Sequence, residues 1–598
     1  MALLKQAKPR YQDCILPSFP KLPSSRWPSR GHHFASFRNS TPSKSFILKA
    51  SLSDPKTCRD ANFRPLANFS PSIWKDTFAS IPHLQSEIES CVKQVEELKE
   101  VVKEMLIAAT DDPAENVLLI DTLCRLGVSY QFETEIEQQL IHIFESYANL
   151  PDNHDYDLYT IALLFRVLRQ HGFKMPCDVF NKFKDENGKF KESLICDVKG
   201  MLSLYQATHL SMHGEDILDE ALAFTTGHLP SLATNSSPHL AKHICEALEQ
   251  PFYTGIPRLE TLKFIPFYEQ DESRNETLLK FSKLDFNKMQ ILYQQELRLV
   301  TSWWNDLNLI SEYPYSRDRV VELYFWCVAE YFESRYSRAR VMLTKILMIL
   351  TVMDDTYDAY GTLDELQCFT QAIERWDIEA LNELPDYMKS LYIAILNLYD
   401  ELDDELSKEG RSYGVACTKD TLKELVRAYL VEAQHFREGV VPPFEERLDN
   451  AVITACPFFV PAASFIGMGE VAGIDAFDWI RSRPQMLIST CIIGRLRADM
   501  VSHEAEQRRG HVASVVEAYM KENGISREET IEKFEIMIDN AWKDVNEGCM
   551  RPTAVAMPLV TVILNVARIG EVFYKKVDGI TNPQHFKHYI KQLFVDPI

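Results

Sequence analysis

The sequence contains little glycine: 21 residues in 598, or about 3.5%, where soluble proteins average about 7%. This shortage argues against glycine-rich nucleotide-binding loops, collagen-like repeats and β-folds with closely spaced turns. Apolar residues make up 46% of the chain and charged residues 25%, which provides enough apolar material for a buried core. At this length the chain can form several domains, or fewer domains if these are large and helical.

Positive charge is also in short supply, because 64 Lys and Arg residues face 86 Asp and Glu residues, for a net charge of −22. General binding of nucleic acid is therefore not expected, since phosphate contacts need a basic surface. An anionic ligand must instead be held by a few local Arg or Lys residues, or by metal ions.

Residues 1–50 depart from this acidic composition. They contain nine Lys or Arg, a single acidic residue, eight Ser and six Pro. A basic, Ser-rich and acid-poor segment is typical of an organelle transit peptide, although an ordinary disordered tail has a similar composition. Because Ser and Pro are so frequent, we predict a transit peptide over 1–50 that directs the protein to the chloroplast (plastid stroma).

The sequence lacks a recognisable cysteine framework and a long apolar run. Its 13 cysteines include no C-x-x-C pair and no Cys/His cluster with zinc spacing, which favours free thiols in a reducing compartment. The central apolar run, 346–353, is far shorter than the roughly 20 residues that cross a bilayer. We therefore expect no transmembrane segment.

What the sequence does contain is helical periodicity. From about residue 75 onward apolar residues recur at spacings of three and four, and strand-like alternation is rare. No repeat of 20–50 residues is evident. The pattern predicts an all-α protein. A break at 251–257, followed by a polar stretch at 269–275, predicts two helical domains over 60–270 and 280–598.

The most informative segment is the apolar run 346–353, which leads directly into Asp354, Asp355 and Asp358. Positions 354 and 358 lie four residues apart, so their carboxylates share one face of a helix and repel each other unless a cation lies between them. Oxygen donors without His or Cys nearby suit Mg²⁺ or Mn²⁺. A solvated acidic turn is the common alternative, but a helix buried all round should not end in exposed charge without a function.

A second acidic helix follows about 140 residues later. Asp499, Ser502 and Glu506 are spaced to share one helical face, and their oxygens form a plausible ligand set for the same metals. Charged helices produce this pattern by chance, so it gains weight only when paired with the first motif. Together the two helices predict two walls that face each other across a metal cluster.

Three arginines accompany these acidic segments. Arg317 and Arg319, two residues apart at an expected helix start, can clamp a phosphate with several charge-assisted donors, and Arg495 lies on the second acidic helix. A surface cluster of ion pairs is the ordinary alternative for such arginines. Carboxylates, divalent ions and a few arginines together predict a diphosphate site.

This combination resembles the plant class I terpene synthases. Residues 354–358 match that family's aspartate-rich motif, 317–319 its diphosphate-binding arginine pair, and 495–506, followed by 509–512, its second metal motif. Arg64-Pro65, followed after eight residues by Trp74, matches its N-terminal signature. The resemblance covers 64–598 and is closest to plastidial casbene-type diterpene synthases, on the segments 123–130, 165–175, 213–218 and 594–598.

The resemblance implies a C-terminal catalytic domain with the class I terpene synthase fold and an N-terminal α-barrel without chemistry of its own. It also implies metal-dependent ionisation of an allylic diphosphate, with three Mg²⁺ or Mn²⁺ ions, and then cyclisation of the carbocation and loss of a proton. The chain has no D-x-D-D, in agreement with the absence of protonation-initiated cyclisation.

By the same resemblance, Asp354, Asp355 and Asp358 are catalytic, and Asp354 and Asp358 bind metal together with the set on the second helix. Trp326 is expected on the pocket floor, and Tyr574 and Asp578 on a segment that helps to close the pocket. One position departs from the family: Ala498 stands where its second metal motif usually begins with Asn or Asp. Either Asp499 replaces that ligand through a small rotation, or one metal is held more weakly, or the activity is impaired.

The substrate is expected to be a small prenyl diphosphate. The casbene-type resemblance and the predicted plastid address favour geranylgeranyl diphosphate and a macrocyclic diterpene of the casbene or cembrene type. Farnesyl diphosphate, converted to a sesquiterpene, is the main alternative, and a C25 diphosphate is another. Two other classes remain open: a chain-elongating prenyltransferase, and a non-catalytic helical scaffold in which Ala498 has broken the metal site.

Overall fold

The computed structural model describes residues 64, 67–74, 77–78, 85–108, 112–148, 156–509 and 513–598, except for the side chains of 85–91, 147–148, 505–506 and 508–509. A single compact unit spans Lys56–Ile598. The predicted transit peptide, 1–50, lies outside the described residues.

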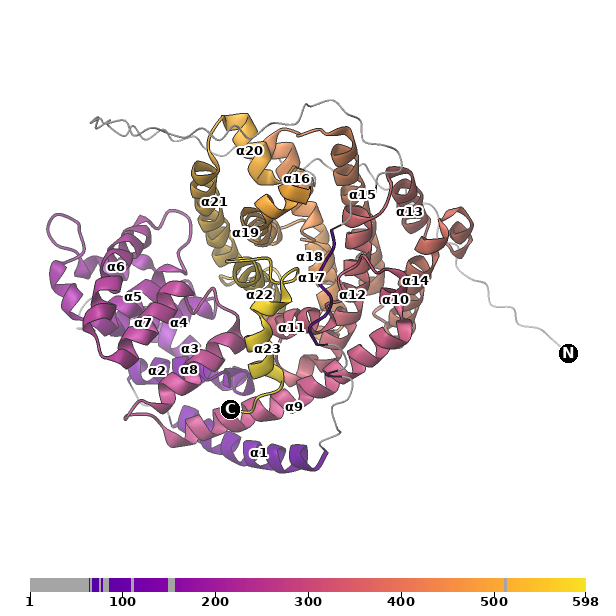
Figure 1. Cartoon of the computed structure of the whole chain (residues 1–598). Helices are drawn as coiled ribbons and strands as arrows, with labels where there is room; N and C mark the ends of the chain where they lie inside the picture. The colour runs from indigo at the N-terminus through magenta and orange to yellow at the C-terminus, as the bar shows by residue number, and fades with distance from the viewer. Residues whose placement is uncertain are drawn as a thin grey trace, which may run out of the picture. The chain divides into compact units, whose positions relative to one another are not determined.

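The described chain is helical throughout, and the expected all-α fold is confirmed. Within the described ranges no β-strand forms, and one isolated bridge joins Lys184 to Phe190. The helices of the first half are α1 (Gln85–Ile107), α2 (Pro113–Arg125), α3 (Glu133–Ala148), α4 (Leu158–Gln170), α5 (Val198–Thr208), α6 (Asp216–Asn235), α7 (Pro238–Glu249), α8 (Pro257–Glu269) and α9 (Glu276–Leu307) (Figure 1).

The second half is equally helical. Its helices are α10 (Leu309–Glu312), α11 (Val320–Glu330), α12 (Ser337–Ala359), α13 (Leu363–Arg375), α14 (Asp386–Ser407), α15 (Ser412–Glu438), α16 (Phe444–Thr454), α17 (Phe459–Ile466), α18 (Ile474–Arg481), α19 (Gln485–Arg509), α20 (Val515–Asn523), α21 (Arg527–Gly548), α22 (Met557–Phe573) and α23 (Lys587–Phe594). Short 3₁₀ turns occur at Ser129–Gln131, Cys177–Phe183, Glu192–Cys196, Ser334–Tyr336, Ile378–Glu383, Gly469–Val471 and Pro583–His585.

Helix α9 links the two halves of the fold. It packs against α1 and α8 on the N-terminal side and against α11, α12 and α23 on the C-terminal side. Its start is fixed by Asn275, whose side chain accepts hydrogen bonds from the N–H groups of Thr277 and Leu278. The polar stretch 269–275 forms the connection between α8 and α9, and the division into domains 60–270 and 280–598 stays a prediction.

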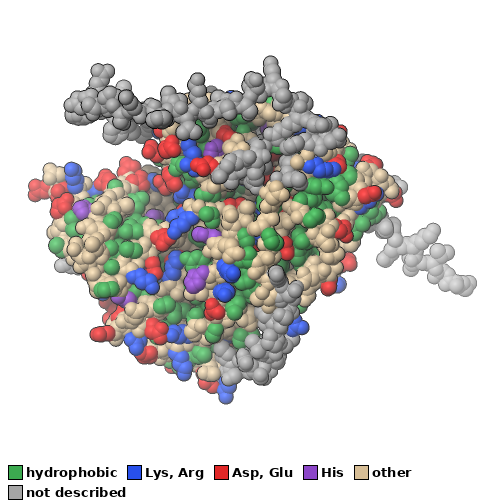
Figure 2. All heavy atoms as spheres, viewed as in Figure 1, with side chains coloured by type: hydrophobic (Ala, Val, Ile, Leu, Met, Phe, Trp, Pro, Cys, Tyr) green, Lys and Arg blue, Asp and Glu red, His purple; other side chains and the backbone are tan. Residues whose placement is uncertain are grey.

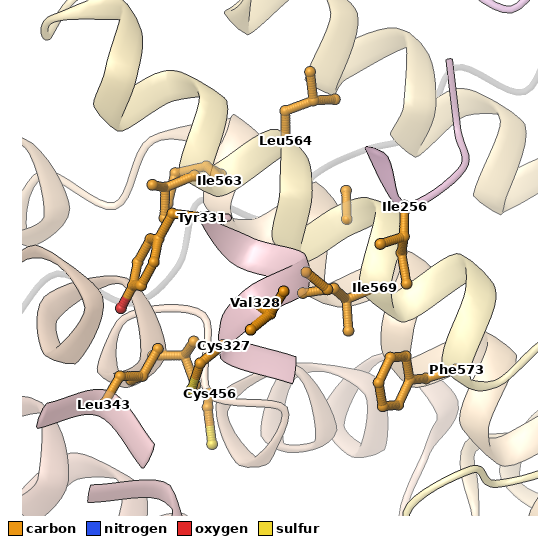
Figure 3. Packing of buried hydrophobic residues seen from close by; sticks show 14 of the residues in the cluster. Ile256, Cys327, Val328, Tyr331, Leu343, Cys456, Ile563, Leu564, Ile569 and Phe573 are labelled. Atoms are coloured by element: carbon orange, nitrogen blue, oxygen red, sulfur yellow. The ribbon is translucent and has the colours of Figure 1, made fainter. Parts of the chain in front are cut away.

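The core of the C-terminal half is built around α11, α12 and α22. In Figure 3, Val328 and Tyr331 lie beside Ile569 and Ile563 of α22, and all four side chains are at most 2% exposed. Burying apolar side chains of this size contributes roughly 1.5–3 kcal/mol each. On α12, the run 346–353 is buried except for Leu350, so the expected buried helix leads directly to the aspartates. The same packing therefore fixes the position of the acidic motif.

The molecular surface is mixed in charge. On the face shown in Figure 2, Lys and Arg side chains are scattered among acidic ones. In the described part of the chain, one segment, Phe444–Ile466, is long and apolar enough to cross a membrane. However, 78% of its most apolar stretch is buried inside the protein. It comprises α16 and α17, which pack against α15 as core elements.

Candidate active site

A cavity of about 310 Å³ opens among the C-terminal helices. Its walls come from α11, α12, α15, α16, α17, α19 and α22, together with connecting segments that include 67–69, 455–456 and 578–581. One part of the lining is apolar and the other carries carboxylates and arginines. The apolar lining includes Leu323, Trp326, Leu347, Leu350, Val460 and Val566, and the charged lining comprises Arg317, Asp354, Asp355, Asp358, Arg495 and Asp578. This division suits a ligand with an anionic head and a hydrocarbon tail.

Two helices cross closely at the cavity wall. A Cβ built on Gly570 of α22 would lie 2.9 Å from the Cα of Gly494 on α19, closer than real Cβ contacts allow. Both glycines line the cavity. At this point the cavity wall is therefore formed by direct backbone contact between α19 and α22.

Arg317 links two of the three aspartates of α12. Its Nη2 donates to Oδ2 of Asp354 at 2.7 Å, and its Nε and backbone N donate to the two carboxylate oxygens of Asp355 at 2.8 and 2.7 Å. Burial opposes the charge on Arg317, but Asp355, Asp354 and Asp578 together raise its pKa above the usual range. Asp355 is fully buried and so serves to orient Arg317 toward the cavity.

Asp354 and Asp358 form the predicted same-face pair, and both line the cavity. Burial raises the pKa of Asp358 well above its usual value, and the neighbouring carboxylates Asp354 and Glu432 raise it further. Crowded carboxylates of this kind favour a bound cation. Hard oxygen donors that face an open cavity fit a partly hydrated Mg²⁺ or Mn²⁺ ion, which usually completes its shell with substrate phosphates.

The facing helix, α19, presents fewer ligands. Ser502 and Ala498 line the cavity, and Ala498 offers no ligand atom. Asp499 does not reach the cavity: its Oδ2 accepts from the backbone N of Val515 at 2.9 Å and its Oδ1 from Arg495 at 3.2 Å. It lies about 100° further round the helix than Ala498, which accounts for its direction. The side chain of Glu506 lies outside the described residues.

The described residues of the cavity offer few ligands for a metal ion. Among the residues that the structure describes, no group of three His, Cys, Asp or Glu side chains is arranged to hold a metal ion. The reasons are local: Asp355 is bound to Arg317, Asp499 to Val515, and position 498 carries alanine. The described donors fit metal ions on the aspartate wall, with a hydroxyl alone on the facing wall.

The predicted diphosphate arginines separate into two groups. Arg317 and Arg495 line the cavity. Arg319 is fully buried and donates to the carbonyl oxygens of Ile580, at 2.8 Å, and Ser70, at 2.7 Å. Burial lowers its pKa, and the adjacent Glu322 opposes that shift. In this structure Arg319 therefore ties the N-terminal segment to the loop that follows α22.

The predicted aromatic and C-terminal residues lie in the cavity wall. Trp326 lies on α11 and packs edge-on against Phe573, with ring centroids 5.3 Å apart. Asp578 accepts hydrogen bonds from the backbone N–H groups of Ile580 and Thr581, each at 3.0 Å, and so shapes the loop at the cavity rim. Burial, with a smaller contribution from Asp578, raises the pKa of Tyr574 above its ordinary value.

Sequence reasoning missed the N-terminal segment as part of the site. Phe69 lies under the guanidinium of Arg317, with its ring centroid at 4.9 Å, and lines the cavity. Arg64 holds Glu365 with two hydrogen bonds, and the indole N–H of Trp74 donates to the buried Glu322 at 2.8 Å. The Arg64 and Trp74 signature was the available signal, because it marked the two ends of this segment without showing what lies between them.

Tyr429 and Thr454 were also missed. Both line the cavity, and Thr454 donates to Glu432, which also receives a hydrogen bond from Arg447 at 2.6 Å. Burial raises the pKa of Tyr429, and Asp354 adds to this effect. No spacing pattern links these residues to the acidic motifs, so the sequence alone gave no signal for them.

Comparison with known proteins gives a consistent result across the chain. Residues 305–544 match the family model described as terpene synthase family, metal binding domain, and residues 73–248 match terpene synthase, N-terminal domain. Valerianol synthase TPS8 of Camellia sinensis is 50% identical over 540 residues, covering 90% of this chain and 97% of that protein. Casbene synthase, chloroplastic, of Ricinus communis is 47% identical over 578 residues, covering 96% of each.

A solved structure supports the same comparison. Isoprene synthase from grey poplar leaves (Populus x canescens), in complex with three Mg²⁺ ions and dimethylallyl-S-thiolodiphosphate, matches with a TM-score of 0.78 and 32% identity. The match covers 85% of this chain and 97% of that one.

Proposed function

The chain belongs to the terpene synthase family, whose members are lyases that act on prenyl diphosphates, and from this membership we propose its substrate and the roles of its site residues. We propose that the enzyme ionises geranylgeranyl diphosphate, cyclises the carbocation to a macrocyclic diterpene of the casbene or cembrene type, and releases diphosphate. One observation carries the choice of substrate. The match to casbene synthase covers 96% of this chain, so it extends into the basic segment 1–50, whereas the match to valerianol synthase covers 90%.

Sequence identity alone does not indicate the substrate, because relatives named for different products are about equally similar to this chain. Farnesyl diphosphate is therefore the main alternative, and a C25 diphosphate is a further one. The cavity volume of about 310 Å³ lies at the lower end of the range of roughly 300–1,000 Å³ for ligand pockets and does not choose among the three hydrocarbon tails.

The charged end of the cavity binds the diphosphate in this proposal. Asp354, Asp358 and Ser502 would hold the divalent ions, Mg²⁺ or Mn²⁺, and three ions are expected by analogy with the grey poplar enzyme. When bound, these ions neutralise the negative charge that develops on the diphosphate as the C–O bond breaks. Arg317 and Arg495 donate hydrogen bonds to the same anion, and Asp355 keeps Arg317 directed at it.

Two residues take different roles from those that the motifs suggested. Because both carboxylate oxygens of Asp499 are already engaged, we propose that it orients Arg495 and leaves the metal site incomplete at position 498. The guanidinium of Arg319 donates hydrogen bonds to Ser70 and Ile580, and we propose that it holds the N-terminal segment over the cavity. Water is thereby kept from the reacting cation.

The apolar end of the cavity folds and guides the hydrocarbon. Once the diphosphate leaves, the positive charge moves along a chain that is surrounded by Leu323, Trp326 and Val460. The face of an aromatic ring stabilises a cation by about 0.5–2 kcal/mol, so Trp326 favours cations that form near it. Tyr574 and Asp578 close this space at the end of α22.

The deciding experiment is a substrate assay on the purified protein. The full chain is incubated with C10, C15, C20 and C25 prenyl diphosphates, with and without Mg²⁺, and products are identified by gas chromatography with mass spectrometry. The proposal expects Mg²⁺-dependent release of a macrocyclic hydrocarbon, with the highest kcat/KM for the C20 substrate. A longer diphosphate product would indicate a prenyltransferase, and no turnover of any substrate would indicate a scaffold.

A further inference from the structure

Beneath the apolar floor of the cavity lies a carboxyl group that the reaction described above does not use. Glu330 is the last residue of α11 and is fully buried. Its Oε1 lies 2.5 Å from the hydroxyl of Ser464 on α17, and its backbone carbonyl accepts from Asn565 of α22 at 2.8 Å. Glu330 therefore joins three helices that build the cavity.

The neighbours of Glu330 connect it to the cavity floor. Trp326 stands one turn before Glu330 on α11, Val460 one turn before Ser464 on α17, and Val566 next to Asn565 on α22. All three of these residues line the cavity. Glu330 thus lies one layer behind the floor, at the junction of its three helices. In Figure 3, Val328 of α11 lies beside Ile569 of α22, and Tyr331, the residue after α11, lies beside Ile563.

Hydrogen-bond counting shows which form of the carboxyl fits this place. The hydroxyl of Ser464 lies 2.7 Å from the carbonyl oxygen of Val460 as well as 2.5 Å from Glu330, but it has a single proton to donate. Both contacts are satisfied when Glu330 is a carboxylic acid that donates to Ser464, while Ser464 donates to Val460. A carboxylate would leave one of these short contacts between two acceptors.

The second carboxyl oxygen of Glu330, Oε2, also favours the neutral acid. Oε2 of Glu330 has the indole N–H of Trp326 near it, but among the residues that the structure describes neither atom completes a hydrogen bond of full geometry. A buried carboxylate with so weak a partner is more costly than a neutral acid. Burial raises the pKa of Glu330 to about 8, and the hydroxyl of Ser464 and the indole of Trp326 reduce this shift without reversing it.

The charged and titratable groups around Glu330 do not compensate a negative charge. Cys327 of α11 and Tyr331, which follows α11 directly, both have pKa values raised by burial and, to a smaller extent, by Glu330 itself. Arg340 of α12 is fully buried, but its guanidinium is bound to Glu296 and to the carbonyl oxygens of Tyr331 and Glu333. The arginine is therefore already neutralised, and Glu330 has no cation of its own.

Resting on the proposed function, we propose that Glu330 is a positioning residue for product specificity: as a neutral acid it ties α11 to α17 and fixes the walls formed by Trp326 and Val460. Ionisation of this group adds a negative charge behind the floor, attracts the carbocation toward it, and breaks the contact with Ser464. The ratio of cyclic products therefore depends on the state of a residue that does not touch the substrate.

The test compares four proteins: wild type, Glu330→Gln, Glu330→Met and Ser464→Ala. The glutamine variant keeps a donor for Ser464 and cannot ionise, so it is the matched control. At pH 7 it is expected to give the wild-type product ratio from geranylgeranyl or farnesyl diphosphate. Glu330→Met and Ser464→Ala are expected to change that ratio several-fold, while the Mg²⁺ concentration for half-maximal rate stays unchanged. Above pH 8 the wild-type ratio departs from that of Glu330→Gln.

A second readout is independent of catalysis. In the unfolded chain a glutamate ionises near its ordinary pKa of about 4.3, whereas folded Glu330 stays protonated up to about pH 8. The folded state then binds more protons between these values, so wild-type stability falls as pH rises. The melting temperature of wild type is expected to fall relative to that of Glu330→Gln between pH 5 and pH 8. If the melting temperatures of wild type and Glu330→Gln change in parallel across this range, the proposal that Glu330 is neutral is wrong.

The two proposals fail in different ways. If Glu330→Met and Ser464→Ala both keep the wild-type product ratio, the positioning role is wrong although the enzyme is a terpene synthase. If no prenyl diphosphate is turned over, the proposed function fails. The pH dependence of melting, and the emission of Trp326 measured as a difference from Trp326→Phe, then still decide whether Glu330 is neutral and positions the indole.

Discussion

At the scale of single residues, the spacing of Asp354 and Asp358 was the most useful sequence pattern for predicting the site. A separation of four places two carboxylates on one helix face whatever the rest of the fold does, and the structure brings both to the cavity. The directions of Asp499 and Arg319 could not be obtained in the same way. Asp499 is held by the backbone of Val515, and Arg319 by Ser70 and Ile580, which lie far from it in the sequence.

The aspartate pair gives the first prediction. Replacing Asp354 or Asp358 with Asn removes a charged metal ligand and is expected to lower kcat on the order of 10²-fold or more, because charge stabilisation at the leaving group is lost. Asp364→Asn is the matched control, since Asp364 lies exposed at the start of α13. Steady-state kinetics at several Mg²⁺ concentrations measure the effect. Equal rates for all three variants would contradict the metal role.

Position 498 gives a second prediction at the residue scale. Ala498 lines the cavity opposite the aspartates but supplies no ligand, so Ala498→Asp is expected to lower the Mg²⁺ concentration for half-maximal rate several-fold. Ala498→Val, which changes size without adding a donor, serves as the control. An unchanged Mg²⁺ requirement in Ala498→Asp would mean that the facing wall binds metal without position 498.

At the level of elements, the sequence predicted the type of secondary structure well and its contacts poorly. Apolar spacing indicated helices throughout, and the run 346–353 does form the buried part of α12. The N-terminal segment 67–74, in contrast, has no periodicity of its own. Its place over the cavity depends on single contacts, such as Trp74 with Glu322, that join residues about 250 positions apart.

The contact between α19 and α22 gives a prediction about elements. Gly570→Ala places a methyl group 2.9 Å from the Cα of Gly494, so the two helices must move apart. We expect a loss of about 1–3 kcal/mol in the free energy of unfolding, and a changed product ratio because both helices line the cavity. Thermal or urea unfolding measures the first effect and product analysis the second.

The reciprocal substitution is the matched control for this pair. A Cβ on Gly494 meets its nearest neighbour, the Cα of Gly570, at 3.6 Å, which is an ordinary van der Waals distance. Since alanine also favours a helix over glycine by up to about 1 kcal/mol, Gly494→Ala is expected to be neutral or stabilising. Similar unfolding midpoints for the two variants would show that the close contact does not separate the helices.

For the whole molecule, the family and the architecture followed from motifs distributed over the chain, but the length of the substrate did not. The described cavity walls come from seven helices and several connecting segments, and the cavity volume depends on how all of them pack. A single residue therefore does not report the chain length of the hydrocarbon. The basic N-terminal segment and the long match to casbene synthase are whole-chain observations, and they support the C20 substrate indirectly, through the compartment.

That compartment gives the last prediction. Residues 1–50 carry a net charge of +8 while 51–598 carry −30. A fluorescent protein fused behind 1–50 is expected to accumulate in chloroplasts, because basic, Ser-rich and acid-poor segments are imported there. The control fusion has the nine Lys and Arg residues replaced by Gln and should stay in the cytosol. A chain that starts at residue 51 should keep kcat/KM within about twofold of the full chain, since the described lining of the site, from Ala67 onward, is kept. Cytosolic fluorescence of the first fusion, with full activity of the shortened chain, would remove the plastid argument and shift the preferred substrate to farnesyl diphosphate.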